Sequence, residues 1–219
     1  MIEVTYIDHM GSDLSVVNAA RVSFGKESLW NWSKELDSDT GDGRILKERD
    51  TKLIKYLAKH RHMSPFGHAF ASFHVKAPIF VARQLVKHKF LRWNEISRRY
   101  VDDEPEFYVP DEWRGRSADK KQGSEGEVNP EYNPQYLDGK IKYAYLQALQ
   151  MGVCPEQARM VLPQSTMTEW YWSGSLDAFI DMCNLRCKDD TQYETRLVAD
   201  YIRVEMIKLF PISVGALVS

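Results

Sequence analysis

The segments with strand character in this chain are few and lie far apart in the sequence. Alternating apolar and aromatic residues predict strands at about residues 2–7, 69–77 and 166–174. Helical spacing of apolar residues is more frequent between and after them. We therefore expect an α+β fold, in which helices pack around a small, mostly antiparallel sheet. With 219 residues, the chain has the length of a single domain.

Amphipathic spacing predicts the helices, and Pro78 suits the first turn of one of them because its missing N–H costs nothing there. Glycine, proline and charged residues predict surface loops at about 34–46 and 111–136. A loop as long as the second is either a lid or a disordered excursion. The predicted helices cover residues 12–24, 48–60, 79–91, 134–151, 155–161, 176–186 and 191–210.

Composition excludes several classes of protein. The formal net charge of -2 argues against general nucleic-acid binding, and no apolar run approaches the roughly 18 residues that cross a bilayer. The first residues do not form a secretory signal. Cys154, Cys183 and Cys187 are too few for a disulfide framework. We expect reduced thiols and a cytoplasmic protein.

Positive charge is concentrated between residues 87 and 100, in the segment KHKFLRWNEISRRY. A guanidinium can hold a phosphate through two parallel N–H bonds, and a serine hydroxyl can complete such a contact. The segment predicts a pocket for anions, although a solvated basic turn would also explain it. Its basic residues are Lys87, His88, Lys89, Arg92, Arg98 and Arg99, and they surround Asn94, Glu95 and Ser97.

His88 lies between two lysines, whose charge should oppose its protonation. We therefore expect a mostly neutral imidazole near pH 7, or else an ordinary surface histidine. Other motifs are missing: there is no GxGxxG after a strand, no GxxxxGK[ST] and no GxSxG. His60, His62 and His68 have no acidic or cysteine partner at ligand spacing, so we do not expect a metal site.

Taken together, these segments resemble the flavin-dependent thymidylate synthases. The signature of that family, RHRxxSxxExSxRY-like, is matched at His88, Asn94, Glu95, Ser97, Arg99 and Tyr100. The resemblance covers most of the chain outside the two loop regions, in the order of the family. Its segments are AARVSF (19–24), RHMSPFGH (61–68), FHVKAPIFVARQ (73–84), KHKFLRWNEISRRY (87–100), ARMVLPQSTMTEWYWSGSLDAF (158–179) and NLRCKDDTQYETR (184–196).

The chain departs from the family pattern at five positions. Lys87 and Lys89 replace the two arginines that flank the histidine, so the charge is kept but the planar fork is lost. Arg92 stands at the first serine of the signature, Gly67 at a usual glutamate and Asp190 at a usual histidine.

The resemblance implies reductive methylation of dUMP to dTMP, with methylenetetrahydrofolate as carbon donor and NADPH as reductant through FAD. It implies catalytic roles for Arg186 and His88. It also implies a homotetramer with sites shared between subunits. The implied dUMP ligands are Gln84, Glu95, Ser97, Arg99, Arg159 and Arg186, and the implied FAD ligands are Ser23, Ser64, Lys87, His88, Lys89 and Asp190.

Two other readings remain open from the sequence. One is a same-fold nucleotide-binding protein or uridylate methyltransferase with weakened flavin use. The other is a non-catalytic module that binds a nucleotide or RNA through the basic segment.

Overall fold

The computed structural model describes residues 1–32, 43–118, 123–129 and 134–218. A four-stranded antiparallel sheet forms its centre, with the strand order β1–β4–β8–β5. The strands are β1 (Glu3–Met10), β4 (Phe70–Pro78), β5 (Leu91–Glu95) and β8 (Met167–Ser175). The expected α+β fold with a small antiparallel sheet is confirmed.

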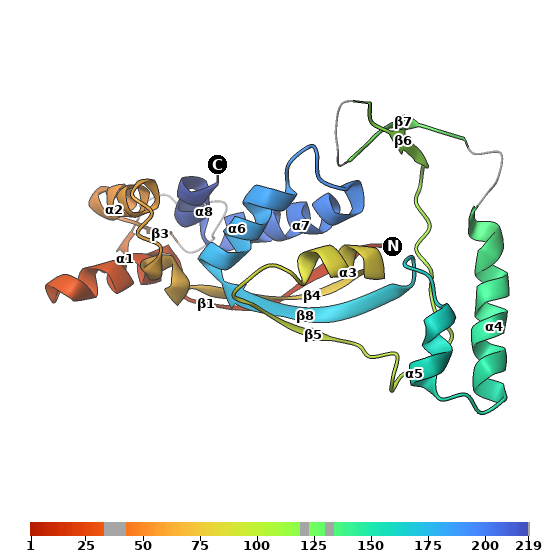
Figure 1. Cartoon of the computed structure of the whole chain (residues 1–219). Coiled ribbons are helices and arrows are strands. Elements are labelled where there is room, and N and C mark those ends of the chain that lie inside the picture. The colour runs from red at the N-terminus through yellow and green to blue at the C-terminus, as the bar shows by residue number, and fades with distance from the viewer. Residues whose placement is uncertain (33–42, 119–122, 130–133, 219) are drawn as a thin grey trace.

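Helices cover one face of this sheet, as Figure 1 shows. These are α3 (Ile79–Leu85), α6 (Leu176–Arg186) and α7 (Tyr193–Leu209). At one end lie α1 (Asp13–Arg21), α2 (Glu48–Lys59) and α8 (Pro211–Leu217). At the other end lie α4 (Asp138–Gln150), α5 (Pro155–Ala158) and a hairpin of β6 (Arg114–Arg116) and β7 (Ser124–Glu127).

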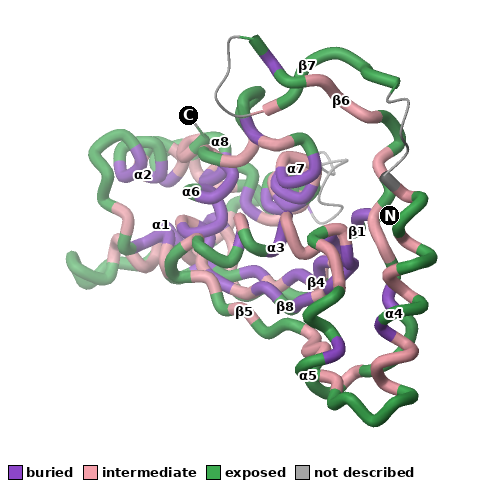
Figure 2. Tube along the Cα trace, turned by 45° about the vertical axis from the view of Figure 1, so that its right-hand side comes forward, coloured by how far each residue is buried: buried purple, intermediate pink, exposed green. Residues whose placement is uncertain are grey.

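The hydrophobic core lies between the sheet and its helices (Figure 2). Successive strand residues point to opposite faces, so Phe73 and Trp172 face the helices. Both rings pack edge-on against Phe179 of α6, with centroids 5.2 and 5.5 Å away. The opposite face is polar, and His74 there contacts Glu169 at 2.9 Å.

The prediction of one helix over residues 79–91 is wrong. α3 ends at Leu85, and Phe90 takes a positive φ of 66° before Leu91 begins β5. The edge of β8 explains the change, because Trp93 of β5 stacks on Trp170 with ring centroids 4.3 Å apart. At Gly174, an added Cβ would lie 3.1 Å from the Phe90 carbonyl oxygen and 3.3 Å from Leu91 Cα, which is tighter than an ordinary contact, so the close approach of β5 favours a glycine there.

Both predicted loop regions contain short strands. Within 34–46, Arg44–Ile45 (β3) pairs with Asn31–Trp32 (β2), while residues 34–42 lie outside the described chain. Within 111–136, β6 and β7 form the antiparallel hairpin. The sequence analysis did not predict α8. No helix in the described ranges is long and apolar enough to span a membrane.

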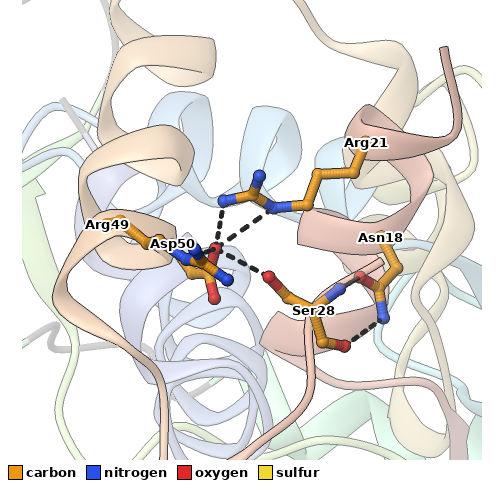
Figure 3. Close-up of polar contacts among 5 residues, drawn as sticks. All are labelled: Asn18, Arg21, Ser28, Arg49 and Asp50. Carbon is orange, nitrogen blue, oxygen red and sulfur yellow. Dashed lines mark hydrogen bonds and ion pairs between the residues drawn. The ribbon is translucent and has the colours of Figure 1, made fainter. Parts of the chain in front are cut away.

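A buried carboxylate ties α1 to α2 (Figure 3). Asp50 of α2 has no exposed surface, and it accepts hydrogen bonds from the Arg21 guanidinium and the Ser28 hydroxyl. The Asn18 amide holds the Ser28 backbone at both its N–H and its carbonyl, at 2.8 and 3.0 Å. These contacts close the turn between residues 21 and 28, which carries Ser23.

Replacing Asp50 by alanine should lower the free energy of unfolding by about 3–5 kcal/mol, because Arg21 would be left half-buried without its counter-charge. Urea denaturation measures the loss. The matched control is Arg49→Ala, since Arg49 is 64% exposed and 3.9 Å from the same carboxylate. Its loss should stay below about 1 kcal/mol. Equal losses in the two variants would contradict the role given to Asp50.

Candidate functional site

A cavity of about 740 Å³ is lined by residues of the helices α3, α6 and α7 and of the β6–β7 hairpin. Helix α3 contributes Phe80 and Gln84, and the C-terminus of α6 contributes Arg186. The connection between β5 and β6 contributes Tyr108, and β6 contributes Arg114. Of the sequence-predicted residues, only Gln84 and Arg186 line this cavity among the described residues.

Arg186 is in contact with His88, which lies in the turn after α3. The Arg186 Nε donates a hydrogen bond to His88 Nε2 at 3.0 Å. Burial, and to a lesser extent the charge of Arg186, lower the pKa of His88 from 6.5 to about 4. Burial also lowers the pKa of the Arg186 guanidinium. The lowered pKa agrees with the predicted neutral imidazole, but its causes are burial and Arg186 rather than the exposed Lys87 and Lys89.

A chain of polar contacts runs along the same wall of the cavity. The Gln84 amide donates to Gln192 Oε1, and Gln192 Nε2 donates to Glu194 Oε2 at 3.3 Å. The other oxygen of Glu194 pairs with the guanidinium of Arg114. Sequence reasoning did not single out Arg114, Gln192 or Glu194. These three residues come together only because the hairpin packs against the start of α7, and no local sequence pattern predicts that contact.

The residues of β5 and the turn after it form a second polar group. The Glu95 carboxylate accepts from Trp93 Nε1 at 3.0 Å and from Thr168 Oγ1 at 2.7 Å, so its position is fixed. Ser97 Oγ accepts from the backbone N–H of Arg99 at 3.3 Å.

The arginines near this group differ in how their charge is engaged. The guanidinium of Arg98 is paired with Asp103 at 2.7 Å, whereas the guanidinium of Arg99 has only the Tyr100 ring and hydroxyl as partners within the described chain. Arg159 lies exposed in a short turn after α5, where its Nε donates to a backbone carbonyl. Arg99 and Arg159 therefore keep their charge available, while Arg98 does not.

The residues predicted to bind a flavin are spread over the molecule. Ser23 and Ser64 are exposed on 3-10 turns near the α1 end of the fold. Lys87 and Lys89 are exposed in the turn between α3 and β5. Asp190 lies in the connection between α6 and α7, and a Cβ added to Gly123 of the hairpin would lie 3.3 Å from its carbonyl oxygen. The six residues therefore come from four separate segments of the chain.

The histidines near residue 60 pack against a tyrosine. The rings of Tyr56 and His60 are 4.3 Å apart, and His62 lies 6.1 Å from Tyr56. Among the residues with described positions, no three His, Cys, Asp or Glu side chains gather as metal ligands would.

Comparison with known proteins places these features in a family. The family described as "Thymidylate synthase complementing protein" matches residues 5–212. The chain is 38% identical to a flavin-dependent thymidylate synthase from Kosmotoga olearia over 202 residues, which are 90% of this chain and 81% of that protein. A flavin-dependent thymidylate synthase from Thermus thermophilus is 39% identical over 208 residues, 94% of this chain and 71% of that protein.

A solved structure agrees with the sequence comparison. The UMP/dUMP methylase PolB from Streptomyces cacaoi, bound with 5-Br dUMP, superposes with a TM-score of 0.79 and 31% identity. The alignment covers 99% of this chain and 94% of that protein.

The His88 ring should titrate with a pKa near 4 in the folded protein. The unfolded chain binds that proton more strongly, so the stability contributed by neutral His88 should be lost as pH falls from about 6.5 towards 4. NMR titration of the imidazole measures the pKa. In Arg186→Gln it should rise yet stay below 6.5, because burial is the larger cause. An ordinary pKa in the unmodified protein would show that the ring is not buried.

Proposed function

The chain belongs to the flavin-dependent thymidylate synthases, and on that premise we propose that it methylates dUMP to dTMP. The carbon comes from methylenetetrahydrofolate, and the reducing equivalents come from NADPH through FAD. The observation that carries the proposal is the cationic Arg186 beside neutral His88 at the wall of a nucleotide-sized cavity. No cysteine is among the described residues that line this cavity. This lining fits activation of the uracil ring by a flavin route rather than by a thiolate.

Arg186 is suited to the charge that develops on uracil. C5 can attack the one-carbon unit only when the ring is electron-rich, with enolate-like negative charge on a ring carbonyl oxygen, and a fixed guanidinium beside that oxygen stabilises the charge. Arg99 and Arg159, with Ser97, would hold the phosphate, since both guanidinium groups are exposed and lack a carboxylate partner among the described residues. Gln84 and Glu95 would orient the base and the sugar.

The residues assigned to FAD fit a dinucleotide with a planar ring. Lys87 and Lys89 are exposed, and neither has an ion-pair partner in the described ranges, so both are available for a pyrophosphate. Phe24 and Phe90 are 79% and 84% exposed next to Ser23 and Lys89, as suits rings that cover a bound aromatic system. When bound, FAD supplies the reducing equivalents. Ser64, His88 and Asp190 complete the proposed set.

We propose a homotetramer whose sites are shared between subunits. The support is that the turns carrying Ser23 and Ser64 lie at the α1 end, whereas the turn carrying Arg159 follows α5 at the opposite end of the molecule (Figure 1). Each subunit would be one domain covering residues 1–219. The three free cysteines fit a reducing compartment, and we place the enzyme in the cytoplasm.

The purified protein, supplied with FAD, should show flavin absorbance between about 300 and 550 nm, and anaerobic NADPH should bleach it faster when dUMP is present. dTMP should then form once methylenetetrahydrofolate is added. UMP in place of dUMP tests the sugar preference, because the two nucleotides differ only at the 2′ position. The absence of flavin binding at every FAD concentration would refute the redox part of the proposal, and bleaching without dTMP would refute the methyl transfer.

Replacing Arg99 by alanine should weaken dUMP binding by about 1.5–3 kcal/mol, the range for hydrogen bonds to charged groups. Titration calorimetry on the FAD-loaded protein measures it. Arg98→Ala is the matched control, because its guanidinium is already engaged by Asp103 and should leave dUMP affinity unchanged. Wild-type affinity in Arg99→Ala would remove that residue from the phosphate site.

A further inference from the structure

The contact between the hairpin and the start of α7 is a buried ion pair at the wall of the cavity. The side chains of Arg114 and Glu194 are only 17% and 5% exposed. Arg114 is further held by the Ser124 hydroxyl, which accepts from its Nε at 2.9 Å, and by the Tyr193 ring 4.5 Å away. A pair with this many supports is fixed in place. It can therefore fix the orientation of Gln192, which donates a hydrogen bond to Glu194.

The charge on Glu194 determines the direction of the hydrogen bonds that follow. An ionised carboxylate only accepts, so the Gln192 group that contacts it must be the NH₂. Gln192 then presents its oxygen to Gln84, and Gln84 must donate from its own NH₂. Among the described residues, the Gln84 amide oxygen and its second N–H remain for a ligand. The positions of this oxygen and this N–H are therefore fixed by the charge of Glu194, which acts through Gln192.

We propose that Arg114 and Glu194 are positioning residues for the base: through Gln192 they fix which side of the Gln84 amide faces the ring, and so make the site select uracil over cytosine. The inference rests on the proposed function, because it takes dUMP as the nucleotide in this cavity. Arg114 and Glu194 need not touch the base themselves.

The chemistry of the two bases explains the selection. Uracil carries an N–H at N3 beside a carbonyl oxygen, whereas cytosine carries a bare N3 beside an amino group, so donors and acceptors are exchanged. An amide that can rotate by 180° exchanges its oxygen and its NH₂ and can therefore hydrogen-bond to either base. A Gln84 amide that is held by Gln192 can pair with only one of the two bases unless it gives up its hydrogen bond to Gln192. The other base would leave a buried polar group unpaired, and the site therefore rejects it.

The test compares dUMP and dCMP binding to the FAD-loaded full chain by titration calorimetry. Wild type should prefer dUMP. Glu194→Gln keeps the shape but lets the group donate as well as accept, and Gln192→Leu breaks the relay while keeping the Arg114–Glu194 pair. In both variants the ratio of dUMP to dCMP affinity should fall by about tenfold or more, as expected for one hydrogen bond. The exposed Arg116 lies on the same strand, and Arg116→Ala should leave the ratio unchanged.

The outcomes separate the relay from the proposed function. A reduced ratio in Gln192→Leu supports the relay, because that variant leaves the hairpin docked. An unchanged ratio in that variant, even with weaker dUMP binding, overturns it and leaves the ion pair a purely structural contact. If Glu194→Gln loses its flavin absorbance or its thermal transition, Gln192→Leu alone decides. Failure of wild type to bind dUMP would instead overturn the proposed function, and this inference with it.

Discussion

The placement of β5 on the edge of β8 is the constraint on which the rest of the site depends. Five residues pair in register, from Leu91 opposite Gly174 to Glu95 opposite Trp170. The Trp93–Trp170 stack adds aromatic contact to this ladder. If the chain had continued as a helix beyond Leu85, neither Glu95 nor the turn that follows would have a fixed position. The sheet edge therefore decides where the basic segment presents its charges.

Local patterns predicted the elements that depend on local contacts. The helix at 176–186 and the strand near 166–174 follow from apolar spacing alone, and the structure has both. The helix prediction was wrong at residues 86–91, and β5 was missed, because the partner strand of β5 lies about eighty positions further along the chain. The short α8 was missed for a similar reason: Asp13 caps it from the other end of the sequence, accepting from the N–H groups of Ile212 and Ser213 at 2.9 Å.

The site residues likewise divide into those that local sequence segments mark and those that only long-range contacts bring together. Gln84, His88 and Arg186 belong to segments whose resemblance to a family assigns them roles, and the structure brings Arg186 to His88 and Gln84 to the same cavity. Arg114 lies in a segment read only as a loop, so nothing local marked it. Gln192 and Glu194 lie within a matched segment but look like ordinary polar residues of a helix start. What distinguishes them is a pair of long-range contacts, and these become visible only in three dimensions.

The two guanidinium groups at the cavity are in opposite electrostatic situations. Arg114 is neutralised by Glu194, so it contributes position rather than charge. Arg186 is half-buried, and within the described chain its hydrogen-bond partner is an imidazole kept neutral by burial. Its charge is thus partly desolvated without a protein counter-ion. That cost is offset when negative charge develops on a ligand in the cavity, which favours the transition state over the neutral base in the ground state.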